Sequence, residues 1–335
     1  MASFRLRCLQ VVEALRAGGI DAGLFDEDGS DVPDVLVLSK RYDGRTVARA
    51  TELRARHGTR LVLDLCDNHF HARVATPEAV KRADALRAAV LAVDAVVCAS
   101  DALAAVVRQE CPAVRRVFVV GDAIEWPRAP SFGSRLAHLA PEWQLARLAR
   151  QLRGLRQPPG GRLVWFGNHG SPNADGGMDD LGRIRDVVHE VHAARGVSLT
   201  VISNSEPRFH EVTAGWRLPV FYLAWHQQTF SRALQLHDVA LIPVGRNPFT
   251  LCKTNNRLAT SLAHGLLCVA DAIPAYEPFA DVAIIDDWSR LRQACDDPGL
   301  RTARVAAGQE RLRRDWSLES MARLWATTLG SIHNG

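Results

Sequence analysis

The densest group of side chains suited to binding phosphate follows a predicted buried strand at residues 239–244. The loop after this strand, residues 245–257, combines cations with amide and hydroxyl donors and leads into a predicted helix. Its candidate donor-binding residues are Arg246, Asn247, Lys253, Thr254, Asn255, Asn256 and Arg257. Cations and free amides at the start of a helix suit a phosphate ester. A solvated helix start capped by an asparagine is the alternative interpretation.

Two further polar loops of the second half follow predicted strands at residues 162–166 and 199–203. They contribute the candidates Gly167, Asn168, His169, Gly170, Ser203 and Asn204. Glycines let a backbone approach a diphosphate closely, and asparagine or serine supplies neutral donors. A tight strand-to-helix turn without any ligand would show the same composition.

In the first half of the chain, polar residues follow a predicted strand at residues 60–65. Asp67, His69 and His71 lie there and are the candidate catalytic residues. A carboxylate or an imidazole at a strand end could act as a general base or contact a reacting sugar. An ordinary loop with surface histidines is an equal alternative, and zinc binding is a third. No motif with zinc-ligand spacing accompanies His69 and His71, which disfavours zinc.

These loops need a scaffold that gathers strand ends, and the hydrophobic pattern predicts one. Short runs rich in valine and leucine alternate with amphipathic stretches, which is typical of parallel α/β layers. The predicted strands are 34–39, 60–65, 94–99 and 116–120, then 162–166, 199–203, 220–223, 239–244, 266–270 and 282–286. The predicted helices are 46–57, 77–92, 101–110, 141–156 and 317–329. Ligands of such sheets bind beyond the carboxyl ends of the strands, where the candidate loops lie.

A stretch of prolines and glycines at residues 158–161 is the strongest linker signal in the chain. We therefore expect an N-terminal Rossmann-like domain at residues 1–157 and a C-terminal Rossmann-like domain at residues 158–335, closed by a packed terminal helix. The chain opens on a helical pattern instead of a strand. Either the first strand of the N-terminal domain is missing from the sequence, or its sheet is one strand short.

The chain has 335 residues, of which 47% are apolar and 23% charged, as in folded water-soluble proteins. Its net charge of +4 is too mild to imply nucleic-acid binding. Seven cysteines without a C-x-x-C pair, and no secretory or membrane-spanning stretch, favour the cytoplasm. The arginine-rich helix at 141–156, with Trp143 near its start, could rest on an anionic membrane surface. Packing between domains is the alternative.

The segment from residue 239 to 279 resembles the C-terminal half of a retaining GT-B glycosyltransferase of the large, family 4-like group that builds bacterial polysaccharides. Asp238, Pro243, Ala263, Gly265 and Val269 occupy positions typical of that family. The resemblance extends more loosely over nearly the whole chain. It implies two facing Rossmann-like domains, a nucleotide-sugar held by the C-terminal one and an acceptor-side histidine in the other. It implies no obligatory metal and no cofactor beyond the nucleotide-sugar as co-substrate.

The resemblance also implies a function: transfer of a hexose-like sugar to a saccharide or lipid-linked acceptor, with retention, in surface polysaccharide or glycoconjugate synthesis. Two glutamates typical of the family fall at Cys252 and Thr260, so neither carboxylate is present. The lysine expected after Gly170 is also absent, which leaves Arg246, Lys253 and Arg257 as diphosphate-binding cations. A non-catalytic subunit that binds a nucleotide-sugar or a partner enzyme is therefore an alternative. A nucleotide-sugar epimerase, which shares the architecture, is another.

Stereochemistry decides which group takes the acceptor proton. With retention, the leaving phosphate takes it, whereas inversion needs Asp67 or a neighbouring histidine as base. The acidic triplet Asp26, Glu27 and Asp28 could mimic the metal-binding Asp-x-Asp motif of the other glycosyltransferase fold. A solvated charged turn is the favoured interpretation of that triplet.

Overall fold

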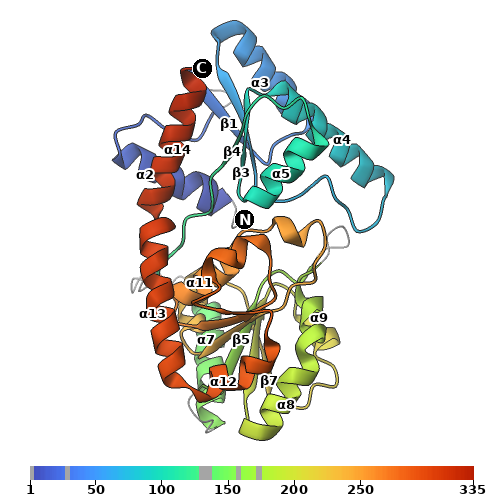
Figure 1. Cartoon of the computed structure of the whole chain (residues 1–335), viewed down its shortest axis with the longest axis vertical. Coiled ribbons are helices and arrows are strands. Elements are labelled where there is room, and N and C mark those ends of the chain that lie inside the picture. Colours follow the sequence, from blue (N-terminus) through green and yellow to red (C-terminus); the bar gives the residue numbers. More distant parts are fainter. Residues whose placement is uncertain (1–3, 27–30, 128–137, 156–159, 171–175) are drawn as a thin grey trace. The chain divides into compact units, whose positions relative to one another are not determined.

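The computed structural model describes residues 4–26, 31–127, 138–155, 160–170 and 176–335 (Figure 1). The chain forms two compact units. Unit 1 comprises residues 1–124, 247–254 and 313–335, and unit 2 comprises residues 125–246 and 255–312. Each unit contains one parallel sheet, so the expected α/β class is confirmed. Glu27, Asp28, Pro158 and Pro159 lie outside the described residues.

The sheet of unit 1 has four parallel strands that are ordered as in the sequence. They are β1 (Val35–Ser39), β2 (Arg60–Leu65), β3 (Ala95–Cys98) and β4 (Val117–Val119). The connecting helices are α3 (Gly44–His57), α4 (Pro77–Ala92) and α5 (Asp101–Glu110). The boundaries of α4 follow from local chemistry, because Thr76 caps its first turn and Pro77 suits the first helical position.

Side chains that alternate along these strands build two apolar layers in unit 1. On one face, Leu61 and Leu63 pack with residues of α4 and α5, among them Leu86 and Leu103. On the other face, Val62 packs with α2 (Gln10–Ala17) and α14 (Leu318–His333). Figure 1 shows α14, in red, beside α2, against which it packs. Both faces are therefore covered by helices, as a parallel sheet requires.

The described residues before β1 contain only helical and irregular structure. A π-helical turn η1 (Arg5–Leu9) runs directly into α2, and an irregular stretch then leads to β1. The sheet of unit 1 thus starts at Val35, in agreement with the helical pattern with which the chain opens.

Unit 2 holds a six-stranded parallel sheet with the strand order β10-β9-β8-β5-β6-β7. Its strands are β5 (Arg162–Phe166), β6 (Ser198–Ser203), β7 (Val220–Ala224), β8 (Val239–Ile242), β9 (Leu267–Ala270) and β10 (Ile284–Ile285). The helices that flank them include α7 (Leu139–Gly154), α8 (Arg185–Arg195), α9 (Glu206–Val212), α10 (Gln227–Leu234), α11 (Asn256–Ala263), α12 (Leu291–Asp296) and α13 (Pro298–Asp315), with 3₁₀ turns η2 (Met178–Ile184), η3 (Thr250–Cys252), η4 (Pro274–Phe279) and η5 (Trp288–Arg290). Strand order reverses between β5 and β8. Doubly wound sheets bind ligands at such a switch point.

The observed grouping differs from the expected division at residue 157. Helix α7 packs on β7 and α10, and Glu142 forms an ion pair with Arg232, so α7 belongs to unit 2. Helix α14 packs on α2 and belongs to unit 1. Both helices form where the sequence predicts them, and Leu145, Leu148 and Leu152 form the buried face of α7. Their partners are distant in sequence, which a local linker signal does not reveal.

Within the described parts of the chain, no helix is both long and apolar enough to cross a lipid bilayer.

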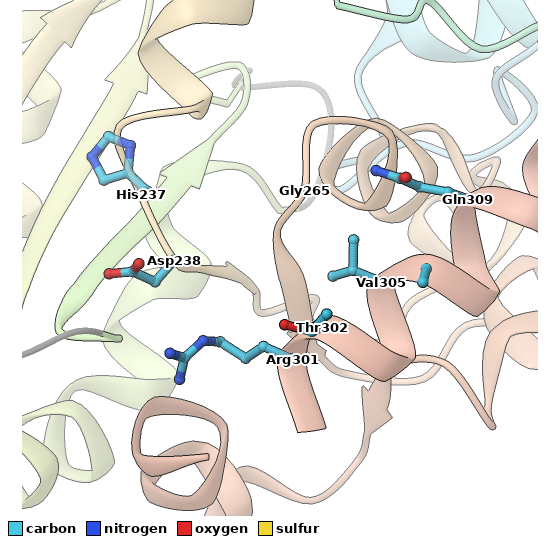
Figure 2. A pocket seen from close by; sticks show the side chains of 8 residues that line it. His237, Asp238, Gly265, Arg301, Thr302, Val305 and Gln309 are labelled. Carbon is cyan, nitrogen blue, oxygen red and sulfur yellow. The ribbon is translucent and has the colours of Figure 1, made fainter. Parts of the chain in front are cut away.

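A pocket of about 350 Å³ lies at the amino ends of β8 and β9 in unit 2 (Figure 2). Figure 2 shows Asp238 on the strand side and Arg301 and Gln309 on α13. The Asp238 carboxylate accepts the backbone N–H of Arg162 at 3.0 Å, while Arg301 donates to two backbone carbonyls of α12 and Gln309 donates to the Leu262 carbonyl. These groups hold α13 and the sheet together. The pocket lies at the amino ends of the strands, whereas ligands of such sheets bind at the carboxyl ends, so we assign the pocket no ligand.

His237, which also lines this pocket, predicts an acid sensitivity. Its ring is buried between the Ala233 carbonyl at 2.8 Å and the Thr200 hydroxyl at 2.7 Å, and burial lowers its pKa to about 4. Between pH 6.5 and 4 the unfolded chain therefore binds a proton that the folded chain refuses, so stability falls as the pH decreases through this window. We expect His237 to account for about 3 kcal/mol of loss between pH 7 and pH 4.

Urea unfolding at both pH values measures this loss. The His237→Gln variant is less stable at pH 7 but loses about 3 kcal/mol less than the wild type on acidification. His57→Gln is the control, because His57 is exposed at the end of α3. Equal acid sensitivity in the wild type and in His237→Gln contradicts the prediction.

Candidate functional site

The switch point of unit 2 is built from the loops that follow β5 and β8. Two carboxylates fix the loop after β8: Asp271 accepts the N–H of Val244 at 2.8 Å, and Asp180 accepts the N–H of Gly245 at 3.1 Å. A Cβ on Gly245 would come within 3.1 Å of the same Asp180 oxygen. Glycine therefore allows this loop to lie close to the carboxylate.

The loop after β5 forms a tight polar turn with the loop after β6. The Asn204 side-chain oxygen accepts the backbone N–H of His169 at 2.9 Å and lies 3.0 Å from the Nδ1 atom of that residue. Ser203 donates to the Gly167 carbonyl at 2.8 Å, and Asn168 accepts the N–H of Gly170 at 3.0 Å. The structure thus brings together all six candidates of these two loops. Gly170 has a φ of 116°, a left-handed conformation that favours glycine.

Arg257, in the first turn of α11, is the cation at this turn. A Cβ placed on Gly167 would lie 3.7 Å from Nη1 of Arg257, so the guanidinium borders the glycine turn directly. Burial raises the pKa of the Tyr276 hydroxyl group, and the positive charge of Arg257 opposes that rise. Asn255 is buried at the N-cap of α11, although its side chain makes no capping bond, and Asn256 starts the helix. These three residues lie in unit 2, as the candidate donor loop requires.

Asp180 completes the switch point and was missed in the sequence, where it lies in an unremarkable acidic pair. It is located in η2, and burial raises the pKa of its carboxyl group while Arg257 and Arg183 oppose that shift. One carboxyl oxygen, Oδ2, has no hydrogen-bond partner among the residues that the structure describes. The switch point therefore combines a glycine turn, a guanidinium and a buried carboxyl group with a free oxygen.

Arg246 is directed elsewhere in unit 2. Its guanidinium forms an exposed ion pair with Asp286 and donates to the Ala272 carbonyl at 3.3 Å. Both partners follow β9 and β10, which lie on the side of β8 away from β5. Asp286 therefore balances the charge that the sequence assigned to a diphosphate.

Residues 247–254 belong to unit 1, where strand-end side chains hold them. Asn68 donates to the Pro248 carbonyl at 2.9 Å, and Ser100 donates to the Cys252 carbonyl at 2.8 Å. Thr254 donates to Asp122 at 3.0 Å, and the Asn247 side chain accepts the N–H groups of residues 249 and 250. Asn247, Lys253 and Thr254 therefore belong to unit 1, whereas Arg257 belongs to unit 2.

Lys253 meets the N-terminal candidates in unit 1. Its ammonium group pairs with one oxygen of Asp67, and Lys40 pairs with the other at 2.6 Å. The Lys253 ammonium also lies 4.1 Å from the centre of the Phe249 ring. Burial raises the pKa of Asp67, but Lys253 and Lys40 outweigh it and hold that pKa well below its usual range. Asp67 is therefore a permanent carboxylate between two of the three lysines of the chain.

His69 is held beside this carboxylate as a neutral ring. The Tyr42 hydroxyl lies 2.7 Å from Nδ1 of His69, and Nε2 lies 4.0 Å from Asp67. Burial lowers the pKa of His69 to about 4, and the positive charges of Lys40, Arg82 and Lys253 add to that effect. Burial also raises the pKa of Tyr42, which keeps its hydroxyl protonated.

The backbone of His71 forms hydrogen bonds with two neighbouring side chains. Its N–H donates to Asn68 at 3.3 Å, and its carbonyl accepts from Arg82 at 3.5 Å. In the described ranges no three histidine, cysteine or acidic side chains are grouped so as to hold a metal ion. Lys40 and Tyr42 were not predicted from the sequence. Both follow the end of β1, and the rule that ligands bind beyond the carboxyl ends of parallel strands, which pointed to Asp67, applies to them equally. Arg82, on the second turn of α4, carries no local signal.

No family model matches the chain, and no curated protein matches it. Solved structures do match it. TarM has a TM-score of 0.64 at 10% identity, covering 91% of this chain and 56% of TarM, so the chain spans about half the length of TarM. HepE from Anabaena, solved with UDP and glucose, has a TM-score of 0.63 at 12% identity, covering 96% of this chain and 81% of HepE.

OtsA, a trehalose-6-phosphate synthase, has a TM-score of 0.61 at 15% identity, covering 96% of this chain and 75% of OtsA. These neighbours are GT-B glycosyltransferases, and the GT-B fold expected from the sequence is confirmed. At such low identity the likeness shows the fold, and function has to be argued from the site.

Proposed function

We propose that the protein is a glycosyltransferase that moves a sugar from a nucleotide-sugar to a saccharide or lipid-linked acceptor, with retention, in bacterial surface polysaccharide or glycoconjugate synthesis. The observation that carries this proposal is the glycine turn bordered by Arg257 at the switch point of unit 2. Such a turn beside a helix start suits a diphosphate. HepE, with the same fold, was solved with UDP, which supports a nucleotide-sugar as donor.

In this proposal the residues of unit 2 stabilise the leaving group. Negative charge grows on the diphosphate as the glycosidic bond breaks, so a fixed guanidinium at Arg257 and the amides of the glycine turn bind the transition state more tightly than the ground state. Asp180 supplies a buried carboxyl group at this point. The chain has Cys252 and Thr260 at the positions of the two family glutamates. We infer that its free oxygen accepts a hydrogen bond from a donor hydroxyl group.

The residues of unit 1 support retention over inversion. A carboxylate paired with two lysines is a weak proton acceptor, because its pKa is far below that of an acceptor hydroxyl group. Tyr42 is bonded to one nitrogen of His69, and burial keeps that ring neutral. Neither group is poised as a strong base, which leaves the departing phosphate to take the acceptor proton. We assign Asp67 and His69 to positioning and polar contact on the acceptor side.

Replacing Arg257 tests the donor site. Arg257→Gln removes the cation but keeps a polar side chain, and we expect the affinity for a nucleoside diphosphate to fall at least about 10-fold, as for the loss of a charge-assisted hydrogen bond. Isothermal titration with UDP and GDP measures this affinity. Arg292→Gln on α12 is the control, since Arg292 is exposed and its ion pair among the described residues is with Asp296 of the same helix. Equal affinities in Arg257→Gln and the wild type count against the donor site.

A non-catalytic role is the second candidate, and one observation favours it. Cys252, at the position of a family glutamate, is buried in the apolar core of unit 1. Turnover of a nucleotide-sugar by the purified protein dismisses this role, and conversion without an acceptor would identify an epimerase.

We also propose a cytoplasmic location with peripheral contact to the membrane through α7. Leu139 and Trp143 are 66% and 60% exposed, and Arg147 lies over the Trp143 ring at 5.8 Å. Arg150 and Arg153 extend the exposed basic face. Apolar anchors beside arginines suit an anionic lipid surface. We expect the wild-type protein to sediment with phosphatidylglycerol vesicles at low salt, and we expect most of this binding to be lost in the Trp143→Ser variant. Equal sedimentation of the two proteins contradicts this contact.

A further inference from the structure

In the part of unit 1 that the structure describes, the charges of three cations and one carboxylate act on His69. Lys40, Arg82 and Lys253 all act on the His69 ring, and Asp67 is the acidic group that opposes them. We propose that this group is an anion subsite that binds a phosphoryl group of the acceptor, so that the acceptor of the reaction is a phosphate monoester. The role of this ligand as the acceptor rests on the proposed glycosyl transfer, whereas the binding of an anion at this subsite does not.

Among the residues that the structure describes, the other acidic groups of this region have partners of their own. Asp64 and Asp122 both bind the buried guanidinium of Arg7. Asp43 is exposed, caps α3 and lies 3.8 Å from Arg41. Asp67 is shared between Lys40 and Lys253.

The group therefore carries about two positive charges more than its carboxylate neutralises. That excess matches the charge of a phosphate monoester near pH 7, which is roughly −1.5 to −2. A neutral saccharide would leave the excess uncompensated.

Arg82 has a buried donor that no described residue uses. Its Nε atom is buried and has no partner among the described residues, and its one hydrogen bond, to the His71 carbonyl, is long at 3.5 Å. A buried donor without an acceptor is costly, and a guanidinium presents a fork that matches phosphate oxygens. Tyr42 and Asp67 both favour the tautomer of His69 that carries its proton on Nε2. A phosphoryl oxygen would thus meet a guanidinium, two ammonium groups and a neutral imidazole donor.

The test uses sn-glycerol 3-phosphate as the probe and glycerol as its uncharged match, with the full-length protein held at saturating UDP. Isothermal titration is expected to detect the phosphate monoester and no binding of glycerol. Arg82→Gln is expected to weaken the binding of the monoester by roughly 10- to 100-fold, as for the loss of a charge-assisted hydrogen bond. Lys81→Gln, the neighbouring exposed position on α4, is the matched control and is expected to bind like the wild type.

Vesicles of phosphatidic acid, compared with phosphatidylcholine, show whether the phosphoryl group belongs to a lipid. Sedimentation that Arg82→Gln abolishes places the phosphate on a lipid-linked acceptor, and binding of the soluble probe alone places it on a soluble one. Both outcomes support the subsite.

The subsite is refuted if UDP displaces the monoester, or if Arg257→Gln removes its binding and Arg82→Gln does not. UDP titrated alone keeps the two proposals distinguishable. A chain that binds the monoester through Arg82 but binds no nucleotide has the subsite without the proposed function.

Discussion

Replacing Arg7 with methionine is expected to destabilise the protein by about 3–5 kcal/mol, because it leaves two buried carboxylates without a cationic partner. Arg7 is only 4% exposed. Its guanidinium lies 2.5 Å from Asp64 and 3.0 Å from Asp122, and it also donates to the Val120 carbonyl at 2.9 Å. Methionine fills a similar volume but offers no donor. The carboxylates would have to remain charged in an apolar setting or bind protons at a cost.

Urea unfolding at pH 7, followed by circular dichroism, measures this loss. Arg49→Met is the control: Arg49 is exposed, and within the described ranges its ion pair is with Glu52 on the same helix, so its loss should change the free energy of unfolding by less than about 0.5 kcal/mol. Adding Asp64→Asn to Arg7→Met should restore part of the stability, since it removes one of the two buried carboxylates that have lost their cation. A loss below about 1 kcal/mol for Arg7→Met would show that the pair is not needed.

Asp67→Asn is expected to lower turnover by roughly 100-fold, the scale on which a fixed charged group acts at a reacting centre. Asparagine keeps the shape of the side chain but releases the ammonium groups of Lys40 and Lys253, which Asp67 now holds. Those cations and His69 would lose their fixed positions. The affinity for a nucleoside diphosphate should stay within about 2-fold of the wild type, because the donor residues belong to unit 2.

Steady-state kinetics with a nucleotide-sugar, together with UDP titration, separates these two effects. Asp84→Asn on α4 is the control, since Asp84 is exposed and forms an ion pair with Arg87 on the same helix. If the turnover of Asp67→Asn stays within about 3-fold of the wild type, then this part of unit 1 does not contribute to the catalytic step.

The sequence predicted the scaffold well, because local chemistry determines most of it. Valine- and leucine-rich runs mark doubly covered strands, and β2 and β5 have the bounds that the pattern indicates. Capping fixed α4 in the same way. Strand β10 is shorter than predicted, with only Ile284 and Ile285 paired to β9. The composition of each unit was not predictable locally, since α14 joins unit 1 through packing on α2.

Local patterns also explain part of how the candidate residues are arranged. Residues that follow strand ends do gather, as Gly167 and Asn204 show in unit 2 and Asp67 and His69 show in unit 1. The loop at 246–257 was treated as one phosphate site, yet Asn68, Ser100 and Asp122 hold its middle portion in unit 1. These side chains lie more than 120 positions away in the sequence, so no local pattern reveals the division. Arg82 and Asp180 were missed because each depends on tertiary contacts.

The most direct test of the central claim is thermal unfolding with UDP-, GDP-, CMP- and dTDP-sugars. A ligand that binds only the folded chain raises the melting temperature by mass action. We predict that at least one of these donors stabilises the wild type and that Arg257→Gln loses most of that stabilisation, while Arg292→Gln keeps it. Stabilisation by none of the four classes, or equal stabilisation of Arg257→Gln and the wild type, would contradict a donor site at the switch point of unit 2.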